Sequence, residues 1–354
     1  MNWPKPQLQE FCRIIQGGRS GLSGNDFVQE GIPAYGAGGL NGYLPTHEFD
    51  EPAVILSSIG ARCGKCFYAE GKWASLANTQ LIFPDATKAD VRFLWIQLND
   101  ESRWHRSGTG QPFIKPSDVK AHRVLLPPLA EQRRIVEGLD RAEALRAKRR
   151  AALAQLDSLT QSLFLDLFGD PKSNPKKWPC VPFAELGENQ DSQRVPVKSS
   201  DRDGRQGKYP YYGASGIIDW VDDFIYEGER LLIGEDGANL VARSTPVAYI
   251  ARGQYWVNNH AHVIADNGRA DLRFLEFFIE QLDLKPFISG TAQPKLNRSN
   301  LDRIAVPFPP IPLQREFARR VTAVEALKTV QRAALAELDA LFATLQHRAF
   351  RGEL

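Results

Sequence analysis

The sequence predicts an α+β protein with two similar globular domains, each followed by a long helix. The two helices are expected to pack as an antiparallel coiled coil with pseudo-twofold symmetry. Three observations predict this fold: sequence features recur at a nearly constant distance in the two halves, short β-type runs fill the first part of each half, and a segment rich in helix-forming residues ends each half.

The repeat is clearest around a turn motif. Residues 108–112 read Gly-Thr-Gly-Gln-Pro and residues 290–294 read Gly-Thr-Ala-Gln-Pro, an offset of 182 residues (290 minus 108). The same offset carries Pro127-Pro128 and Gln132-Arg133 onto Pro309-Pro310 and Gln314-Arg315. Upstream, Tyr35-Gly36-Ala37 matches Tyr212-Gly213-Ala214 at an offset of 177 (212 minus 35), and small loop insertions explain the drift. The chain is therefore a tandem duplication.

The repeat unit also sets the domain boundaries. Residues 1–128 are predicted to form the first domain, 129–170 the first long helix, 171–310 the second domain and 311–354 the second long helix. Short β-type runs cover residues 53–56, 80–83, 231–233, 247–250 and 262–264. Apolar periodicity predicts one helix inside each domain, over residues 88–99 and 271–282.

Apolar residues step by three and four along both long helices, which predicts a coiled-coil seam. The predicted seam residues are Leu153, Leu156, Leu163, Leu167, Leu335, Leu338, Phe342 and Leu345. A helix of about forty residues spans roughly 60 Å, more than a domain of this size, so each helix needs the other as its partner and the domains are expected at opposite ends. The alternative is that each helix packs only on its own domain. Arg146 and Arg149 fall near the stripe, and the pattern leaves open whether they splay, snorkel or bind something.

Composition limits the function classes. An apolar fraction of 43% and a charged fraction of 24% are typical of soluble globular proteins, and no apolar run is long enough to cross a membrane. Four cysteines and an N-terminus without a signal pattern predict a reducing, cytoplasmic location. Because the net charge is only +2, any contact with nucleic acid is expected to be local or shared with partners.

No metal site is expected. Cys63-Gly64-Lys65-Cys66 is half of a zinc site without the other two ligands, so it is interpreted as a turn with two ordinary thiols. His260 and His262 alternate on a predicted strand over residues 256–265 and would face one side, as a metal pair does. The first domain has no histidine there, which favours a polar strand face. Glu235-Asp236 has no acidic counterpart in the first domain and is interpreted as part of a turn.

No catalytic residues are assigned. The sequence lacks a nucleophile elbow, a nucleotide-binding lysine loop and the Asn-Pro-Pro-Tyr/Phe signature of enzymes that methylate amino groups. Basic, aromatic and amide side chains do fall in predicted loops, where they suit contacts to phosphates and base edges. The candidates for DNA contact are Arg19, Tyr35, Arg62, Lys65, Arg103, Arg106, Gln111 and Lys115 in the first domain, and Arg194, Lys198, Lys208, Tyr212, Asn239, Arg243, Arg252, Gln293, Lys295 and Arg298 in the second. For each of them, a solvated surface position is an equal alternative.

A Gly-Thr-x-Gln-Pro turn followed by Pro-Pro-x-x-x-Gln-Arg and a long helix, twice in one chain, resembles the specificity subunit of a type I restriction-modification system. The resemblance covers essentially the whole chain. It implies two target-recognition domains that each read one half of a split sequence in double-stranded DNA, and a subunit that is not itself an enzyme. It implies modification methyltransferase subunits, expected in two copies, and restriction endonuclease subunits as partners. S-adenosylmethionine and ATP would bind those partners, and no cofactor is expected on this chain.

The resemblance assigns framework positions but no base-reading residues. Tyr35-Gly36, Gly60, Tyr212-Gly213 and Gly237 match the framework of the family. The low similarity of the two domains elsewhere predicts an asymmetric target. Two domains on the same face of the DNA are expected to read half-sites centred roughly 10 base pairs apart. Two alternatives remain open: an enzyme acting on DNA through a motif that is not visible, and a coiled-coil scaffold that binds proteins without reading DNA.

Overall fold

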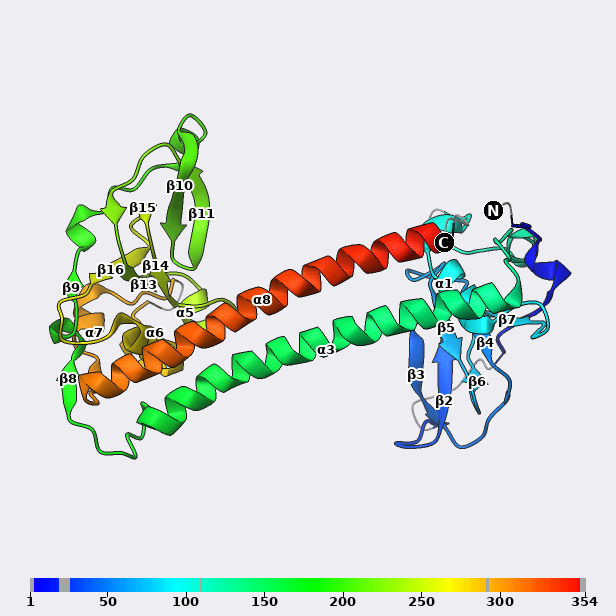
Figure 1. The fold of residues 1–354 in the computed structure, drawn as a ribbon, viewed down its shortest axis with the longest axis horizontal. Coiled ribbons are helices and arrows are strands. Elements are labelled where there is room, and N and C mark those ends of the chain that lie inside the picture. The colour runs from blue at the N-terminus through cyan, green and yellow to red at the C-terminus, as the bar shows by residue number, and fades with distance from the viewer. Residues whose placement is uncertain (1–2, 19–25, 109, 291–292, 351–354) are drawn as a thin grey trace. The chain divides into compact units, whose positions relative to one another are not determined.

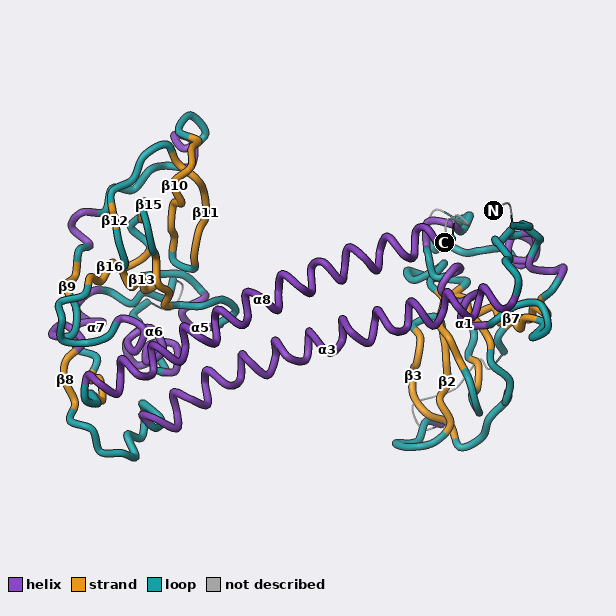
Figure 2. The backbone as a smooth tube through the Cα atoms, in the orientation of Figure 1, coloured by secondary structure: helices purple, strands orange, loops and turns teal. Residues whose placement is uncertain are grey.

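The structure is a computed structural model that describes residues 3–18, 26–108, 110–290 and 293–350. The chain divides into two compact units, one formed by Met1–Arg150 with Ala333–Leu354 and the other by Ala151–Arg332. Two long helices, α3 (Leu129–Phe168) and α8 (Ile311–Ala349), each contribute to both units (Figures 1 and 2). No helix in the described part of the chain is long and apolar enough to cross a membrane.

A four-stranded antiparallel sheet forms the core of the first unit. Its strand order is β1 (Cys12–Gln16), β7 (Thr79–Pro84), β4 (Ala53–Ser57) and β5 (Cys66–Ala69). Every residue of β4 is buried, because both faces of this central strand are covered. Helix α1 (Val91–Leu98) buries Phe93, Leu94 and Leu98. Its N-cap is Asp90, whose carboxylate accepts hydrogen bonds from two backbone N–H groups of the first turn.

A smaller sheet and short helices complete the first unit. Strands β3 (Gly39–Leu44), β2 (Ile32–Gly36) and β6 (Ala74–Ser75) form this sheet, in which β2 and β3 make a hairpin. Helix α2 (Pro116–Ala121) and the 3-10 helices η1 (Leu8–Glu10) and η3 (Glu101–Arg103) lie in the connections. The hairpin and the large sheet position the loops considered below.

The second unit repeats this order. Strands β9 (Glu188–Asn189), β16 (Ala261–Ala265), β13 (Arg230–Gly234) and β14 (Ala248–Ala251) pair as β1, β7, β4 and β5 do. The hairpin of β10 (Gln206–Gly213) and β11 (Gly216–Val221) corresponds to β2 and β3, and it pairs with β15 (Gln254–Val257), which in turn pairs with β12 (Tyr226–Glu227). Helix α6 (Leu272–Gln281) corresponds to α1. The remaining elements are β8 (Cys180–Pro182), β17 (Ala305–Pro307), α4 (Ser199–Arg202), α5 (Asn239–Ala242), α7 (Arg298–Asp302), η4 (Phe183–Glu185), η5 (Asp191–Gln193) and η6 (Lys285–Phe287).

The predicted α+β class, with a long helix after each domain, is confirmed. The single strand predicted over residues 256–265 is wrong. The chain turns between β15 and β16, where the backbone N–H of His260 donates to Asn258 Oδ1 at 2.8 Å. His260 is therefore exposed on the turn, whereas His262 is buried in β16, and the two rings do not share a face.

The two long helices pair within the first unit. Ile135, Val136 and Leu139 of α3 cluster with Phe342 and Ala349 of α8. Arg146 Nε binds Asp339 Oδ1 at 2.5 Å, and its guanidinium also pairs with Glu143 and lies 4.4 Å from the centre of the Phe342 ring. The early residues of α3 thus meet the late residues of α8, which is the antiparallel arrangement.

The same pairing recurs in the second unit. Phe164 and Phe168 of α3 pack edge-on against Phe317 of α8. Lys328 Nζ binds Asp157 Oδ1 and Glu325 Oε1, both at 2.9 Å, and its side chain is only 7% exposed. The repeat offset carries Glu143, Arg146 and Asp339 onto Glu325, Lys328 and Asp157, so each unit holds one copy of the same charged layer.

All eight predicted seam leucines and phenylalanines are half-buried. Leu163 and Leu167 pack on the core of the second unit, and Phe342 and Leu345 on the cluster between the helices of the first. The predicted stripe missed Phe164 and Phe168, which are more buried than the predicted seam residues because they also face the domain. It also left the role of Arg146 open, and the structure places this side chain in an interhelical ion pair.

We expect Asp157→Ala to lower the free energy of unfolding by about 1 kcal/mol, because the buried ammonium of Lys328 loses its partner across the helix pair while Asp157 itself is mostly exposed. Urea unfolding of the full chain measures this. Asp166→Ala, at an exposed position on the same helix, is the matched control. Equal destabilisation by the two variants would contradict a stabilising role for the ion pair.

Candidate nucleic-acid interface

In the first domain, a central strand, a glycine-rich turn and a hairpin tip are brought together. The backbone N–H of Gly60, just after β4, donates to Pro112 O at 2.9 Å. The N–H of Ile114 donates to Ser58 O, also at 2.9 Å. Arg62 Nη1 then donates to Gly38 O at 2.7 Å, which connects this segment to the tip of the β2–β3 hairpin.

The second domain uses the same bonds at equivalent positions. The N–H of Gly237 donates to Pro294 O at 3.0 Å, and that of Leu296 donates to Glu235 O at 2.8 Å. Asn239 Nδ2, which occupies the place of Arg62, lies 3.2 Å from Ser215 Oγ at the tip of the β10–β11 hairpin. We call this group of three segments the loop cluster: residues 36–39, 58–65 and 108–114 in the first domain, and 213–216, 235–247 and 290–296 in the second, as far as these are described.

The glycines of the motifs have a conformational role in this cluster. Gly60 and Gly237 have φ values of +104° and +106°, and Gly108 and Gly290 have φ values of +88° and +81°. L-residues other than glycine rarely adopt this region, so glycine permits the turns. At Gly108 and Gly290 an added Cβ would also meet the carbonyl oxygen of Gln111 or Gln293 at less than 3 Å.

The Pro-Pro-x-x-x-Gln motif joins each domain to its long helix. Gln132 is fully buried, its Oε1 accepts from the backbone N–H of Asp90 at 2.8 Å, and its Nε2 donates to Pro127 O at 2.8 Å and Lys88 O at 2.9 Å. Gln314 is equally buried and bonds to the N–H of Asp271 at 3.0 Å and to Pro309 O at 2.7 Å. Sequence reasoning found these glutamines through the repeat but gave them no role.

The framework is shared between the domains, but the side chains it carries are not. Equivalent positions in the loop cluster and its supporting strand hold different chemical groups. The pairs are Ser58 and Glu235, Ile59 and Asp236, Arg62 and Asn239, Gln80 and His262, and Phe113 and Lys295. The same backbone scaffold therefore presents two different surfaces.

A charged cluster includes Glu235 and Lys295 of the second domain's loop cluster. Glu235 binds Arg194 Nη1 at 2.7 Å and Lys295 Nζ at 3.1 Å. His262 Nδ1 lies 2.6 Å from Asp191 Oδ2. Burial raises the pKa of Asp191, but the hydrogen bond and charge of His262 outweigh it and hold the pKa below its ordinary value of 3.8. Burial likewise raises the pKa of Glu235, and Arg194, His262 and Lys295 together hold it below 4.5.

These contacts correct the interpretation of Glu235 as a simple turn residue, because its side chain is 12% exposed and paired twice. Asp191, Glu235 and His262 are close enough together, within 4.8 Å, to hold a metal ion. However, Arg194 and Lys295 already balance the charge of the carboxylates.

The thiols of Cys63 and Cys66 in the first domain are buried and donate to the carbonyls of Ser58 and Leu98, and burial raises the pKa of both.

The remaining candidates for DNA contact differ in whether their side chains already bind another group of the protein. Several arginines bind protein groups: Arg103 with Asp100, Arg106 with Glu101, Arg252 with Glu229, Arg298 with Asp302, and Arg243 with the carbonyls of Ile279 and Leu282. Lys65, Lys115, Lys198 and Lys208 are exposed and form no ion pair with the residues the structure describes. Gln111 and Gln293 are exposed on the turns, whereas Tyr35 and Tyr212 pack on Trp73 and Tyr255. Arg19 lies outside the described residues.

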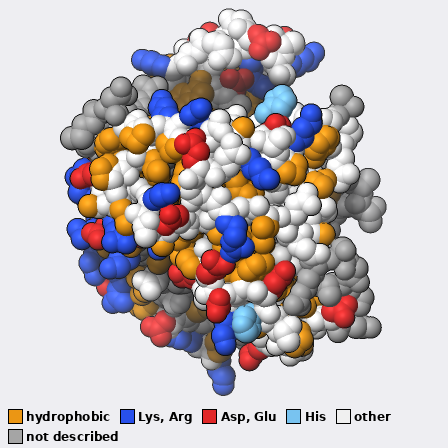
Figure 3. Space-filling model, turned by 90° about the vertical axis from the view of Figure 1, so that its right-hand side faces the viewer, with side chains coloured by type: hydrophobic (Ala, Val, Ile, Leu, Met, Phe, Trp, Pro, Cys, Tyr) orange, Lys and Arg blue, Asp and Glu red, His pale blue; other side chains and the backbone are white. Residues whose placement is uncertain are grey.

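Charge is not concentrated on the face of the molecule drawn in Figure 3, where basic and acidic side chains are interspersed. This pattern agrees with a net charge of only +2. A net charge this low gives the chain as a whole only weak attraction for phosphates.

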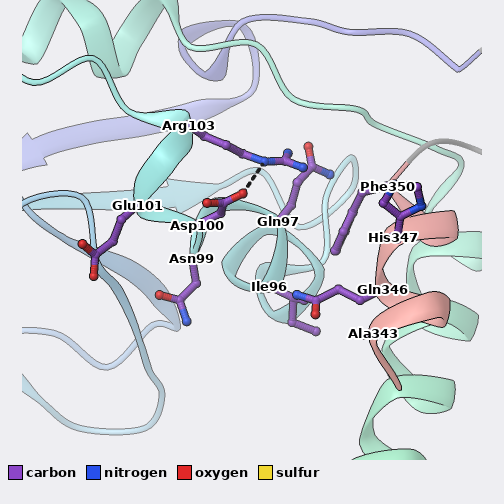
Figure 4. Close-up of a pocket in the computed structure, with 10 residues that line it drawn as sticks. All are labelled: Ile96, Gln97, Asn99, Asp100, Glu101, Arg103, Ala343, Gln346, His347 and Phe350. Carbon is purple, nitrogen blue, oxygen red and sulfur yellow. Dashed lines mark hydrogen bonds and ion pairs between the residues drawn. The ribbon is translucent and has the colours of Figure 1, made fainter. Parts of the chain in front are cut away.

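A cavity of about 660 Å³ in the first unit lies between the end of α1, η3 and the end of α8. Ile96 and Gln346 line it, with His347 of α8 and Phe350 just after this helix on one side and the Asp100–Arg103 pair opposite (Figure 4). The second unit has Phe277 and Phe164 at these positions, and their stacked rings are 6.5 Å apart. The smaller or polar side chains of the first unit leave the space open.

Fold and site together define a class: a duplicated binding protein in which one scaffold presents two different loop surfaces. The chain matches the type I restriction modification DNA specificity domain over residues 1–155 and again over residues 175–339. It therefore belongs to that family, and its two matched regions make it a specificity subunit with two recognition domains.

Relatives and solved structures agree with this assignment. A Haemophilus influenzae protein assigned as the type I restriction enzyme specificity subunit S.HindORF215P is 37% identical over 147 residues, which cover 41% of this chain and only 37% of that protein. The Escherichia coli type I restriction enzyme EcoDI specificity subunit is 22% identical over 100% of this chain and 89% of its own length. The type I restriction-modification S subunit from M. genitalium shares the fold, with a TM-score of 0.67, 17% identity, and coverage of 99% of this chain and 96% of that one.

We expect Glu235→Gln to lower the free energy of unfolding by about 1–3 kcal/mol at pH 7, since Arg194 and Lys295 lose a charged acceptor. The pKa of Glu235 is lowered in the folded state, so its contribution is complete above its ordinary value of 4.5 and is lost as the pH falls through the lowered value. Urea unfolding between pH 7 and pH 3 should show the variant converging on the unmodified chain. Asp203→Asn, at an exposed carboxylate, is the control, and a pH-independent difference for Glu235→Gln would refute the assignment.

Proposed function

We propose that this chain is the non-catalytic, DNA-reading subunit of a type I restriction-modification complex. Each domain reads one half of a split, asymmetric sequence in double-stranded DNA. The observation that carries the proposal is the loop cluster: identical backbone bonds hold it in both domains, while its equivalent side chains differ. A shared scaffold with different hydrogen-bonding groups is what two readers of unlike half-sites require.

We propose that modification methyltransferase subunits dock on the paired helices and recognition domains, in two copies, and that restriction subunits join this complex. Exposed leucines support the proposal. Leu145 and Leu341 in the first unit are 51% and 50% exposed, and Leu159 and Leu327 in the second are 43% and 52% exposed. The repeat relates Leu145 to Leu327 and Leu159 to Leu341, and each immediately precedes a residue of the interhelical seam. Exposed apolar groups at repeated positions suit a protein partner present twice.

The weak basic charge gives the partners a further role. The net charge of +2 is small for gripping a duplex, so much of the phosphate neutralisation would come from the partner subunits, and binding by the complex should depend on salt. S-adenosylmethionine and ATP would then be bound by those subunits and not by this chain. Methyl transfer by the purified chain alone would favour the rival assignment as an enzyme.

Exchanging residues 1–128 for the first domain of another family member should change one half of the methylated sequence and leave the other half unaltered. The two domains have separate cores and separate loop clusters, so each is expected to read independently. Sequencing of methylated adenines in cells carrying the assembled complex measures the result. Alteration of both halves, or of neither, would contradict independent reading.

The double variant Leu145→Ser, Leu341→Ser should weaken binding of modification subunits by tenfold or more, about 1.4 kcal/mol or above, without lowering the unfolding midpoint, because both side chains already lie half in solvent. Isothermal titration with purified modification subunits measures the affinity. Ala147→Ser with Ala340→Ser, at exposed positions on the same two helices, is the matched control. Unchanged affinity in the leucine variant would remove these residues from the interface.

A further inference from the structure

We propose that His262 is a positioning residue: as a doubly protonated imidazolium, it fastens Leu296, which follows the glycine-rich turn of the second recognition domain, to the adjoining sheet. The inference rests on the proposed function, since the turn is part of the loop cluster assigned to DNA reading. The first domain makes the equivalent attachment with a neutral amide. The two readers would therefore be held by different chemistry.

The first step concerns hydrogen-bond donors. His262 is 1% exposed, its Nδ1 lies 2.6 Å from Asp191 Oδ2, and its Nε2 lies 2.8 Å from Leu296 O. A backbone carbonyl oxygen can only accept, and so can an ionised carboxylate. A neutral imidazole has one N–H and can satisfy only one of the two, so the geometry requires a proton on both nitrogens.

Two carboxylates approach the ring, and each is also bound to a cation. Asp191 lies beside the ring, and Glu235 at the end of β13 approaches Nδ1 to 3.9 Å. Arg194 lies between these two carboxylates, and Lys295 binds Glu235. With a charged ring, the two carboxylates, these two cations and His262 have a formal charge of +1. The hydroxyl of Tyr226 donates to the nearby Gln190 O. The exposed ring of His260 forms a hydrogen bond with Asp236 and does not belong to this cluster.

The bond from the ring fixes the segment that follows the turn. Leu296 offers its oxygen to His262 while its N–H donates to Glu235 O, so both backbone groups of one residue are anchored to the sheet. Lys295 pairs across the same strand edge with Ser289, on the other side of the glycine turn. Replacement of the ring by an apolar side chain would remove one of these attachments and leave a buried carbonyl without a donor.

The equivalent contact in the first domain supports the role proposed for the bond between His262 and Leu296. The repeat places Gln80 at the position of His262, and Gln80 Nε2 donates to Ile114 O at 3.1 Å, the equivalent of Leu296 O. Gln16 pairs with Gln80 on the neighbouring strand, where the second domain has Asp191. The attachment to the segment after the turn is kept in both domains, while the charge is present only in the second.

The protonation state can be measured without DNA. Selective ¹⁵N labelling of histidine in the full chain at pH 7.5 should give two ring N–H signals for His262, assigned by their loss in His262→Gln. A buried ring with both nitrogens in hydrogen bonds exchanges its N–H protons with water slowly enough for their signals to be observed. A single ring N–H, with the other nitrogen unprotonated or bound to a metal, would overturn the proposal.

The positioning role is tested with paired variants in the assembled complex. His262→Leu should weaken binding at least tenfold only for DNA with an intact second half-site, relative to DNA in which that half-site is scrambled. Gln80→Leu is the matched variant in the first domain and should affect only the other half-site. The double variant Asp191→Asn, His262→Gln reproduces the neutral attachment and should recover binding to within about threefold of the unmodified chain.

The outcomes separate this inference from the proposed function. Failure of the unmodified complex to prefer any sequence would end the proposed function, whatever the ring signals show. Sequence-specific binding that His262→Leu lowers equally for both half-sites, or not at all, would overturn the positioning role alone. Lack of recovery in the neutral double variant would also overturn it, because folding of that variant can be verified independently by its urea midpoint.

Discussion

A buried glutamine amide holds each recognition domain to the helix that follows it, and the rest of each repeat depends on this joint. Gln132 and Gln314 accept from the N-cap residues of α1 and α6 and donate to a proline carbonyl at the start of the long helix. An amide can do both at once because it carries an acceptor and two donors. The adjacent prolines provide no backbone N–H, so no competing bond forms there.

This joint explains why the loops can differ while the scaffold stays the same. The buried glutamine and the apolar side chains of each long helix that pack on the domain lie outside the loop cluster. Arg62 and Asn239, or Phe113 and Lys295, can therefore replace one another across the repeat without disturbing the attachment. The joint between domain and helix therefore uses residues that differ from those exposed in the loop cluster.

The sequence alone predicted the features that depend on local pattern. The repeat, the long helices and the main strands follow from spacing and composition, which act over short distances along the chain. The turn between β15 and β16 was not predicted from the sequence. The residues of this turn, which Asn258 stabilises, continue the alternation of apolar and polar residues that is typical of a strand. The roles of Glu235, Gln80 and Asp191 could not be predicted, since their partners lie dozens of residues away and burial decides their importance. One signal was available in the sequence: the repeat aligns Glu235 with Ser58, so the carboxylate is present in only one of the two domains.

The charged layer between the helices shows how a duplicated chain can specify its own pairing. Arg146 and Lys328 occupy equivalent seam positions, and each finds an aspartate from the other helix and a glutamate from its own. Burying such cations contributes little net stability, because desolvation offsets much of the attraction. What it does is penalise any other alignment, in which a buried cation would lack its carboxylate. The seam thus selects one alignment through charge, which leaves the leucines on its flank free to remain exposed for another partner.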